Sequence, residues 1–165
     1  MGYGTVGSGV YEVIKKNQVS INKKVGQELK VQYVLDLREF PGDPVMDVLT
    51  HDFEDILNDD EVKIVAEVMG GLHPAYEFTR RCLEAGKSVC TSNKELVAEH
   101  GAELIQIAKD HQVNYLFEAS VGGGIPIIRP LNSSLTADVI VEISGILNGT
   151  TNYMLTKMSR EGLNY

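Results

Sequence analysis

Short apolar runs alternate with stretches of helical periodicity along most of the chain, and this alternation limits the possible folds more than any other feature. Strands separated by helices require crossover connections, which produce a parallel sheet covered by helices. The sequence therefore predicts an α/β fold, a Rossmann-like doubly wound parallel sheet. The expected strands span residues 31–35, 63–68, 88–91, 114–118 and 139–147.

Helical periodicity and helix-boundary residues mark the segments between these strands. Pro74 suits the first turn of a helix, and Gly86 suits the position just beyond its end. Asn148 or Thr150 can cap a final helix. The polar, lysine-rich segment 17–30 is expected to be a surface connection. The expected helices span residues 8–16, 74–85, 95–111 and 152–160. Residues 47–57 are expected to form a helix or a turn of helix.

The chain of 165 residues carries a net charge of −8, and this acidic balance argues against a nucleic-acid partner. No apolar run reaches the roughly 18 residues that a membrane span needs. No basic stretch followed by an apolar core marks a secretory signal. Cys82 and Cys90 lie within apolar patterns, as buried free thiols do. We therefore expect a cytoplasmic protein with no membrane partner.

Three glycines near the amino terminus, Gly2, Gly4 and Gly7, form the pattern G-x-G-x-x-G ahead of an amphipathic segment. In a dinucleotide-binding turn the first permits a tight turn, the second lets the phosphates approach, and the third lets helix pack on strand. The amides near Thr5 and Val6 would face a pyrophosphate at the positive end of the helix dipole. A glycine-rich turn without a ligand is the alternative.

An acid and a base that favour different cofactors follow the expected strand 31–35. Asp36 would accept a hydrogen bond from the ribose 2′-hydroxyl of NAD, whereas Arg38 would bind the 2′-phosphate of NADP. Because both are present, the choice between NAD and NADP stays open. Arg38 could equally be a solvated surface residue.

Two further loops follow expected strands at the edge where open parallel sheets bind ligands. Gly70, in the turn VMGG, permits close approach of a flat cofactor or belongs to a plain turn. In the stretch TSNKEL, Lys94 could orient a carbonyl or carboxylate, or move a proton. Ser92 and Asn93 are helix caps on the simpler interpretation, and both interpretations can hold together.

The stretch FEASVGGGIPII combines an acid with three consecutive glycines. Glycine allows backbone angles at which several carbonyls point inward, and oxygens beside a carboxylate can hold a hard cation. The alternative is a hinge between domains with a buried, hydrogen-bonded Glu118. The later stretch NGTTNY suits an anion or substrate site, or only a helix cap. The four histidines show no ligand spacing.

Five stretches, in order and over essentially the whole chain, resemble homoserine dehydrogenase: GYGTVGSGV, VMGG, AGKSVCTSNKELVAEHG, FEASVGGGIPII and GILNGTTNYMLTKM. The resemblance implies an NAD(P)H-dependent oxidoreductase that reversibly reduces aspartate 4-semialdehyde to homoserine, on the route to threonine, methionine and isoleucine. It also implies a homodimer. Another NAD(P)-dependent two-domain oxidoreductase is the first alternative. A thioester-forming aldehyde dehydrogenase is disfavoured because neither cysteine lies in a nucleophile loop.

Residue roles also follow from the resemblance. Lys94 is the implied catalytic residue, beside nicotinamide and substrate. Residues 1–125 would form the cofactor-binding domain, and 126–165 would begin the substrate and dimerisation domain. The implied cofactor-binding residues are Gly2, Gly4, Thr5, Val6, Gly7, Arg38, Gly70, Ser92 and Lys94. The implied ligands of a sodium ion, mostly main-chain oxygens, are Glu118, Val121, Gly123 and Ile125.

The sequence departs from the family pattern at both ends. The family's first strand, its substrate-binding acids and its second catalytic lysine have no counterparts among these residues. The sequence alone therefore suggests a fragment missing both ends, with weaker nucleotide binding than an intact enzyme and no turnover of its own. A catalytically incomplete nucleotide-binding module is accordingly the second alternative.

Overall fold

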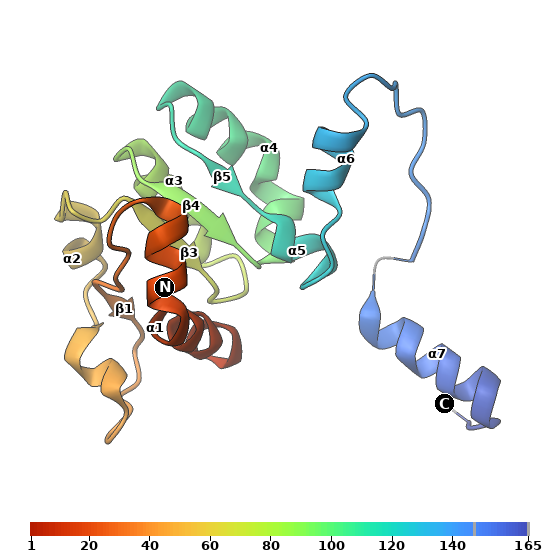
Figure 1. Ribbon diagram of the computed structural model, residues 1–165, viewed down its shortest axis with the longest axis horizontal. Coiled ribbons are helices and arrows are strands. Elements are labelled where there is room, and N and C mark those ends of the chain that lie inside the picture. Colours follow the sequence, from red (N-terminus) through yellow and green to blue (C-terminus); the bar gives the residue numbers. More distant parts are fainter. Residues whose placement is uncertain (147, 165) are drawn as a thin grey trace. The chain divides into compact units, whose positions relative to one another are not determined.

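The computed structural model describes residues 1–146 and 148–164, which fall into two units (Figure 1). The first unit, Met1–Phe117, contains every strand that the structure describes. The second unit begins at Glu118 and consists of helices and irregular backbone in its described part. The domain boundary near residue 125 that the sequence suggests stays a prediction.

Two parallel sheets form the centre of the first unit. In one, β1 (Val34–Leu35) pairs with β2 (Leu49–Thr50). In the other, β4 (Ser88–Thr91) lies between β3 (Ile64–Glu67) and β5 (Tyr115–Leu116). All three pairings are parallel, and helices connect the strands of the larger sheet. This arrangement confirms the Rossmann-like α/β class that the alternation predicts.

The backbone of Met1 and Gly2 connects the two sheets. On one side, the Gly2 amide donates to the Leu35 carbonyl at 2.8 Å. On the other side, the Met1 amino group donates to the Ala66 carbonyl at 2.7 Å, and the Met1 carbonyl accepts from the Val68 amide at 3.0 Å. Met1 therefore lies between β1 and β3, and the chain turns away from the sheets at Gly2.

The core of the larger sheet is built with two amphipathic helices, α3 (Ala75–Glu84) and α4 (Lys94–Asp110), which pack against each other. Apolar residues recur at helical spacing, so one face of each helix is buried. As the sequence predicts, Gly86 lies just beyond α3 with a φ of +76°. The fully buried side chains include Cys82, Leu83, Val89, Leu96 and Leu104.

One expectation for the first unit is wrong, and another holds only in part. α1 (Thr5–Val25) continues through most of the segment 17–30 that was expected to be a connection. Its lysines and glutamine are good helix formers in an exposed helix, and Gly26, with a φ of +80°, ends it.

The segment 47–57, expected to be a helix or a turn of helix, is helical only in part. Leu49 and Thr50 leave helical geometry because their backbone supplies the hydrogen-bond partners that β1 needs. The region instead contains the 3-10 helix η1 (Pro44–Val48), β2 and α2 (Phe53–Asn58).

The described part of the second unit contains α5 (Glu118–Gly122), α6 (Ile128–Ser134) and α7 (Gly149–Glu161). The first two form where the sequence suggested a glycine loop and a polar stretch. Asn148 caps α7, as predicted, because its side-chain oxygen accepts the Thr151 amide at 2.8 Å.

The strand expected at 139–147 is wrong for residues 139–146, which have irregular backbone. A strand requires a partner for its backbone groups, and no described strand runs beside this segment. Leu147 lies outside the described residues. No helix in the described ranges is long and apolar enough to cross a membrane.

Candidate functional site

The three glycines near the amino terminus form a tight turn between the sheets and α1. Gly2 has a φ of +92°, in the left-handed region that favours glycine. A Cβ on Gly7 would lie 2.0 Å from the Gly2 carbonyl oxygen, so α1 can approach the turn only with glycine at that position. A Cβ on Gly4 would meet nothing within 4 Å. The turn therefore combines close packing on its inner side with room for a ligand outside.

The first turn of α1 offers hydrogen-bond donors at this open side. Gly4 is the N-cap and provides no side-chain hydrogen bond, and the Ser8 amide donates to its carbonyl at 2.9 Å. The amides of Thr5 and Val6 precede that bond and have no acceptor in the helix. Both residues are exposed. Unpaired amides at the positive end of a helix dipole attract anions.

Asp36 and Arg38 follow β1 and form a bidentate ion pair. Nε and Nη2 of Arg38 donate to the Asp36 carboxylate oxygens at 2.9 and 3.0 Å. Asp36 also accepts the Tyr3 amide at 2.8 Å, which ties it to the glycine turn. These hydrogen bonds, led by Arg38, hold the pKa of the Asp36 carboxyl well below its usual range. The Arg38 side chain stays 62% exposed and can meet an anion beside the turn.

The loops after β3 and β4 are joined by side chains that the sequence reasoning missed. Glu67 is fully buried, and its carboxylate accepts the Met69 amide at 2.8 Å and the Thr91 hydroxyl at 2.5 Å. Asn93, the N-cap of α4, donates from its side-chain amide to the Gly71 carbonyl at 2.6 Å. The signal was present: an acid that ends an apolar strand must find hydrogen-bond partners when it is buried.

Three predicted site residues lie on these two loops. Gly70 has a φ of +79°, and the Ser92 amide donates to the Glu67 carbonyl at 3.3 Å. Lys94 is exposed at the start of α4 and has no ion-pair partner among the described residues. A lysine there opposes the helix dipole, which favours acids in the first turn. Helix stability therefore gives no reason for this lysine.

Lys87, the other lysine of the stretch AGKSVCTSNKEL, lies before β4, at the opposite end of that strand from Lys94. It is buried, and its ammonium group donates to the carbonyls of Asp59 at 2.6 Å and Val62 at 3.0 Å. Lys87 therefore fastens the loop before β3 and takes no part in the candidate site.

The residues implied as sodium ligands lie in the second unit. The Glu118 carboxylate accepts the amides of three consecutive residues at the start of α6, and these bonds lower its pKa. Gly123 has a φ of +61° between α5 and α6, and Val121 and Ile125 lie on either side of it. The part of the chain that the structure describes gathers no three His, Cys, Asp or Glu side chains suited to a metal. The donors to Glu118 are Ile127, Ile128 and Arg129.

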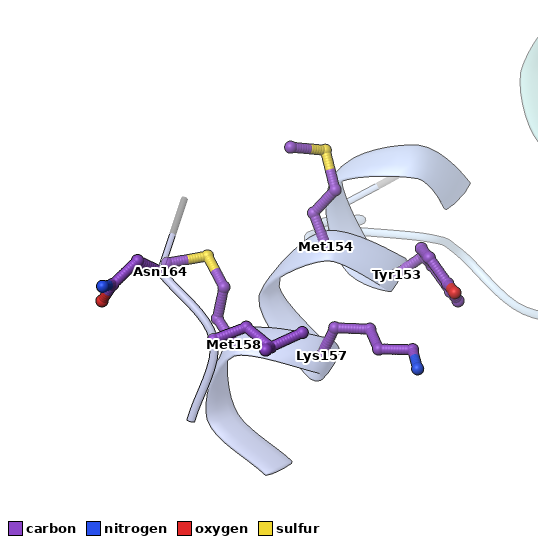
Figure 2. Close-up of a pocket in the computed structure, with 6 residues that line it drawn as sticks. Tyr153, Met154, Lys157, Met158 and Asn164 are labelled. Carbon is purple, nitrogen blue, oxygen red and sulfur yellow. The ribbon is translucent and has the colours of Figure 1, made fainter. Parts of the chain in front are cut away.

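A pocket of about 380 Å³ lies along α7 (Figure 2). The ammonium group of Lys157, in its lining, pairs with Glu161 at 2.6 Å, and Tyr153 is 65% exposed. Among its described lining residues, the pocket contains none of the predicted site residues and offers no unpaired charged group. Its lining residues are Tyr153, Met154, Lys157, Met158, Leu163 and Asn164.

Comparison with known proteins gives one consistent family. A family model described as homoserine dehydrogenase, NAD binding domain, matches residues 2–118, and one described as homoserine dehydrogenase matches residues 126–165. The homoserine dehydrogenase of Lactococcus lactis is 41% identical over 172 residues, with 100% of this chain and 40% of that protein covered. That of Bacillus subtilis is 42% identical over 164 residues, with 98% and 38% covered.

Solved structures agree with this result. A homoserine dehydrogenase from Thiobacillus denitrificans matches with a TM-score of 0.87 and 38% identity, covering 98% of this chain and 38% of that one. A hyperthermophilic archaeal homoserine dehydrogenase mutant in complex with NADPH matches with a TM-score of 0.79 and 28% identity, covering 99% and 56%. The chain thus spans about two fifths of the length of the curated relatives it matches.

Proposed function

Because the chain belongs to the homoserine dehydrogenase family, we propose that the whole protein reversibly reduces aspartate 4-semialdehyde to homoserine with NADPH or NADH. One observation carries this proposal. The Asp36–Arg38 pair and the exposed Lys94 lie on loops at the carboxyl ends of parallel strands, where open sheets bind cofactors, and the glycine turn is hydrogen-bonded to the last residue of β1. A bound nicotinamide cofactor supplies the hydride that reduces the aldehyde carbon.

The amides of Thr5 and Val6, on the open side of Gly4, would donate hydrogen bonds to the pyrophosphate of the cofactor. The empty space around a Cβ position at Gly4 and the close contact of Gly7 with Gly2 support this role. Gly70 and Ser92 bind farther along the cofactor, on the loops after β3 and β4.

Arg38 makes the protein accept the 2′-phosphate of NADPH. Its guanidinium neutralises Asp36, whose carboxylate would otherwise repel that phosphate, and its exposed side offers a further donor. NADH remains usable because its 2′-hydroxyl can hydrogen-bond the same pair.

Lys94 acts on the substrate carbonyl. Its ammonium group donates a hydrogen bond to the carbonyl oxygen, stabilises the negative charge that develops there and passes a proton to the forming alkoxide. The absence of an ion-pair partner among the described residues leaves this charge free for the substrate.

Three further assignments belong to the proposal. Main-chain oxygens of Glu118, Val121, Gly123 and Ile125 hold a sodium ion. The Glu118 side chain is occupied by amides of α6, so only its carbonyl serves as a ligand. The whole protein is a cytoplasmic homodimer.

The test measures NADPH oxidation with aspartate 4-semialdehyde by a protein of the relatives' full length that contains this chain. The Lys94→Ala variant should lose most of its kcat and keep its affinity for NADPH, because the ammonium group acts on the substrate carbonyl. The Lys109→Ala variant, in the last turn of α4, serves as the matched control and should keep its kcat. NADPH binding without turnover in the unaltered protein would instead favour a non-catalytic nucleotide-binding module.

A further inference from the structure

Glu67 is a fully buried acid at the carboxyl end of β3 to which the proposed reaction assigns no role. One carboxylate oxygen accepts the Met69 amide at 2.8 Å, and the other accepts the Thr91 hydroxyl at 2.5 Å. Burying a carboxylate costs free energy even when it is hydrogen-bonded, and an apolar side chain would fill the same space more cheaply. The charge therefore calls for a reason other than packing.

The two oxygens of Glu67 hold two different loops. Met69 begins the turn that continues through Gly70 and Gly71, both at positive φ. Thr91 is in turn bonded to Asn93, because its hydroxyl oxygen accepts the Asn93 amide at 2.9 Å. The Asn93 side chain donates to the Gly71 carbonyl at 2.6 Å, in the loop that follows β3. These bonds form a closed ring that links the ends of β3 and β4.

Asn93 connects this ring to the candidate catalytic residue. Its side-chain oxygen accepts the Leu96 amide at 3.1 Å, which fixes the first turn of α4. Lys94 is the next residue, and its side chain has no ion-pair partner among the described residues. Its placement therefore depends on Asn93, and through Thr91 on Glu67.

We propose that Glu67 is a positioning residue, whose carboxylate sets the spacing between the turn 69–71 and Lys94. The inference rests on the proposed function, since it concerns where Lys94 meets the substrate carbonyl. A carboxylate suits the task because it only accepts, and both loops present donors to it. Small displacements of a catalytic group lower the rate strongly, so a rigid ring has a direct effect on turnover.

Two substitutions each remove the hydrogen bond between Thr91 and Glu67, one by changing the acceptor and the other by removing the donor. In Glu67→Gln, the amide group faces the Thr91 hydroxyl, whose proton then has no acceptor, while the Met69 bond can persist. Thr91→Val removes the hydroxyl and keeps the shape of the side chain. Thr91→Ser keeps the hydroxyl and is the matched control.

We expect Glu67→Gln and Thr91→Val to lower the kcat of the whole protein by about tenfold to a hundredfold. Because Gly70 and Ser92 lie on the loops that loosen, the KM for NADPH should rise too, but by a smaller factor than the kcat falls, and Thr91→Ser should retain the kcat. Because Glu67 acts through Lys94, adding Glu67→Gln to Lys94→Ala should cause little further loss. An equal loss from Glu67→Gln in both backgrounds would overturn the proposal.

Amide hydrogen exchange provides a readout without turnover. In Glu67→Gln, exchange should accelerate at residues 69–71 and 92–96 and stay unchanged in β5 and the second half of α4. Acceleration throughout β3, β4 and β5, or none at all, would reduce Glu67 to a packing residue and overturn the proposal. If the unaltered protein shows no turnover, the proposed function fails, and the exchange pattern alone decides whether Glu67 holds the two loops.

Discussion

At the scale of single residues, the role proposed for Arg38 at the cofactor's 2′-position can be tested by substitution. Arg38→Ala removes the cation and leaves the Asp36 carboxylate facing the phosphate. A charge-assisted hydrogen bond contributes about 1.5–3 kcal/mol, so NADPH affinity should fall about tenfold or more while NADH affinity changes little. Fluorescence titration with both cofactors measures this ratio. Arg80→Ala, which breaks ion pairs on α3, is the control and should leave both affinities unchanged.

Asp36 should make the stability of the first unit depend on pH. Its folded pKa lies below the unfolded value of about 3.9, so its contribution to stability is complete above about pH 5 and is lost as the pH falls toward the folded pKa. Asp36→Asn should lower the free energy of unfolding by about 1–3 kcal/mol near neutral pH. The difference in free energy of unfolding between Asp36→Asn and the unaltered chain should disappear at acid pH.

Denaturant titrations at several pH values measure the effect of Asp36→Asn. Asp47→Asn changes an exposed aspartate with no hydrogen bond or ion pair among the described residues, and it serves as the control. A gap for Asp36→Asn that stays constant from neutral to acid pH would contradict the assignment of this carboxyl.

At the scale of elements, the junction between the glycine turn and α1 depends on one missing Cβ. Gly7→Ala would place a methyl 2.0 Å from the Gly2 carbonyl oxygen, which forces the helix away from the turn. We expect a loss of about 1–3 kcal/mol and weaker NADPH binding. Gly9→Ala, on the same helix with open space around its Cβ, should instead stabilise the chain by up to about 1 kcal/mol. Equal behaviour of the two variants would contradict the close-packing role.

The elements also show what the sequence could and could not predict. The strand at 88–91 and the helix after Asn93 were predictable because an apolar period and a cap residue coincide there. β2 was missed because its two residues are strand only through their pairing with β1, a contact distant in sequence. The segment 139–146 failed for the converse reason, since its apolar, β-branched run finds no partner strand among the described residues.

The parts of the candidate site that the sequence could predict are those in which a short motif fixes the local backbone. The glycine turn and Lys94 follow from local spacing, and the structure brings both to the carboxyl ends of the strands. The ring of Glu67, Thr91 and Asn93 was missed because the two bonds that close it, from Thr91 to Glu67 and from Asn93 to Gly71, join residues more than twenty positions apart. Side-chain hydrogen bonds across a sheet leave no periodic trace in a sequence.

At the scale of the whole molecule, the two units differ in how their helices are buried. α4 contributes several buried side chains to the core of the first unit, whereas α6 and α7 contain no buried residue. Val139 and Val141, between them, are 89% and 94% exposed. The family models divide at a similar place, with matches to residues 2–118 and 126–165. Stability in this chain is therefore concentrated in the unit that carries the glycine turn and Lys94.

This difference in burial predicts which parts of the 165-residue chain unfold locally most easily. Local opening costs little free energy where few apolar groups are buried, so amides of α6 and α7 should exchange at least about a hundredfold faster than those of β3, β4 and α4. NADPH should slow exchange at residues 1–8 and 91–95, which face the proposed cofactor, and leave α7 unaffected. Exchange followed by mass spectrometry with and without NADPH measures both effects. Protection of α7 equal to that of α4 would contradict the stability difference, and protection by NADPH confined to the second unit would contradict the cofactor site.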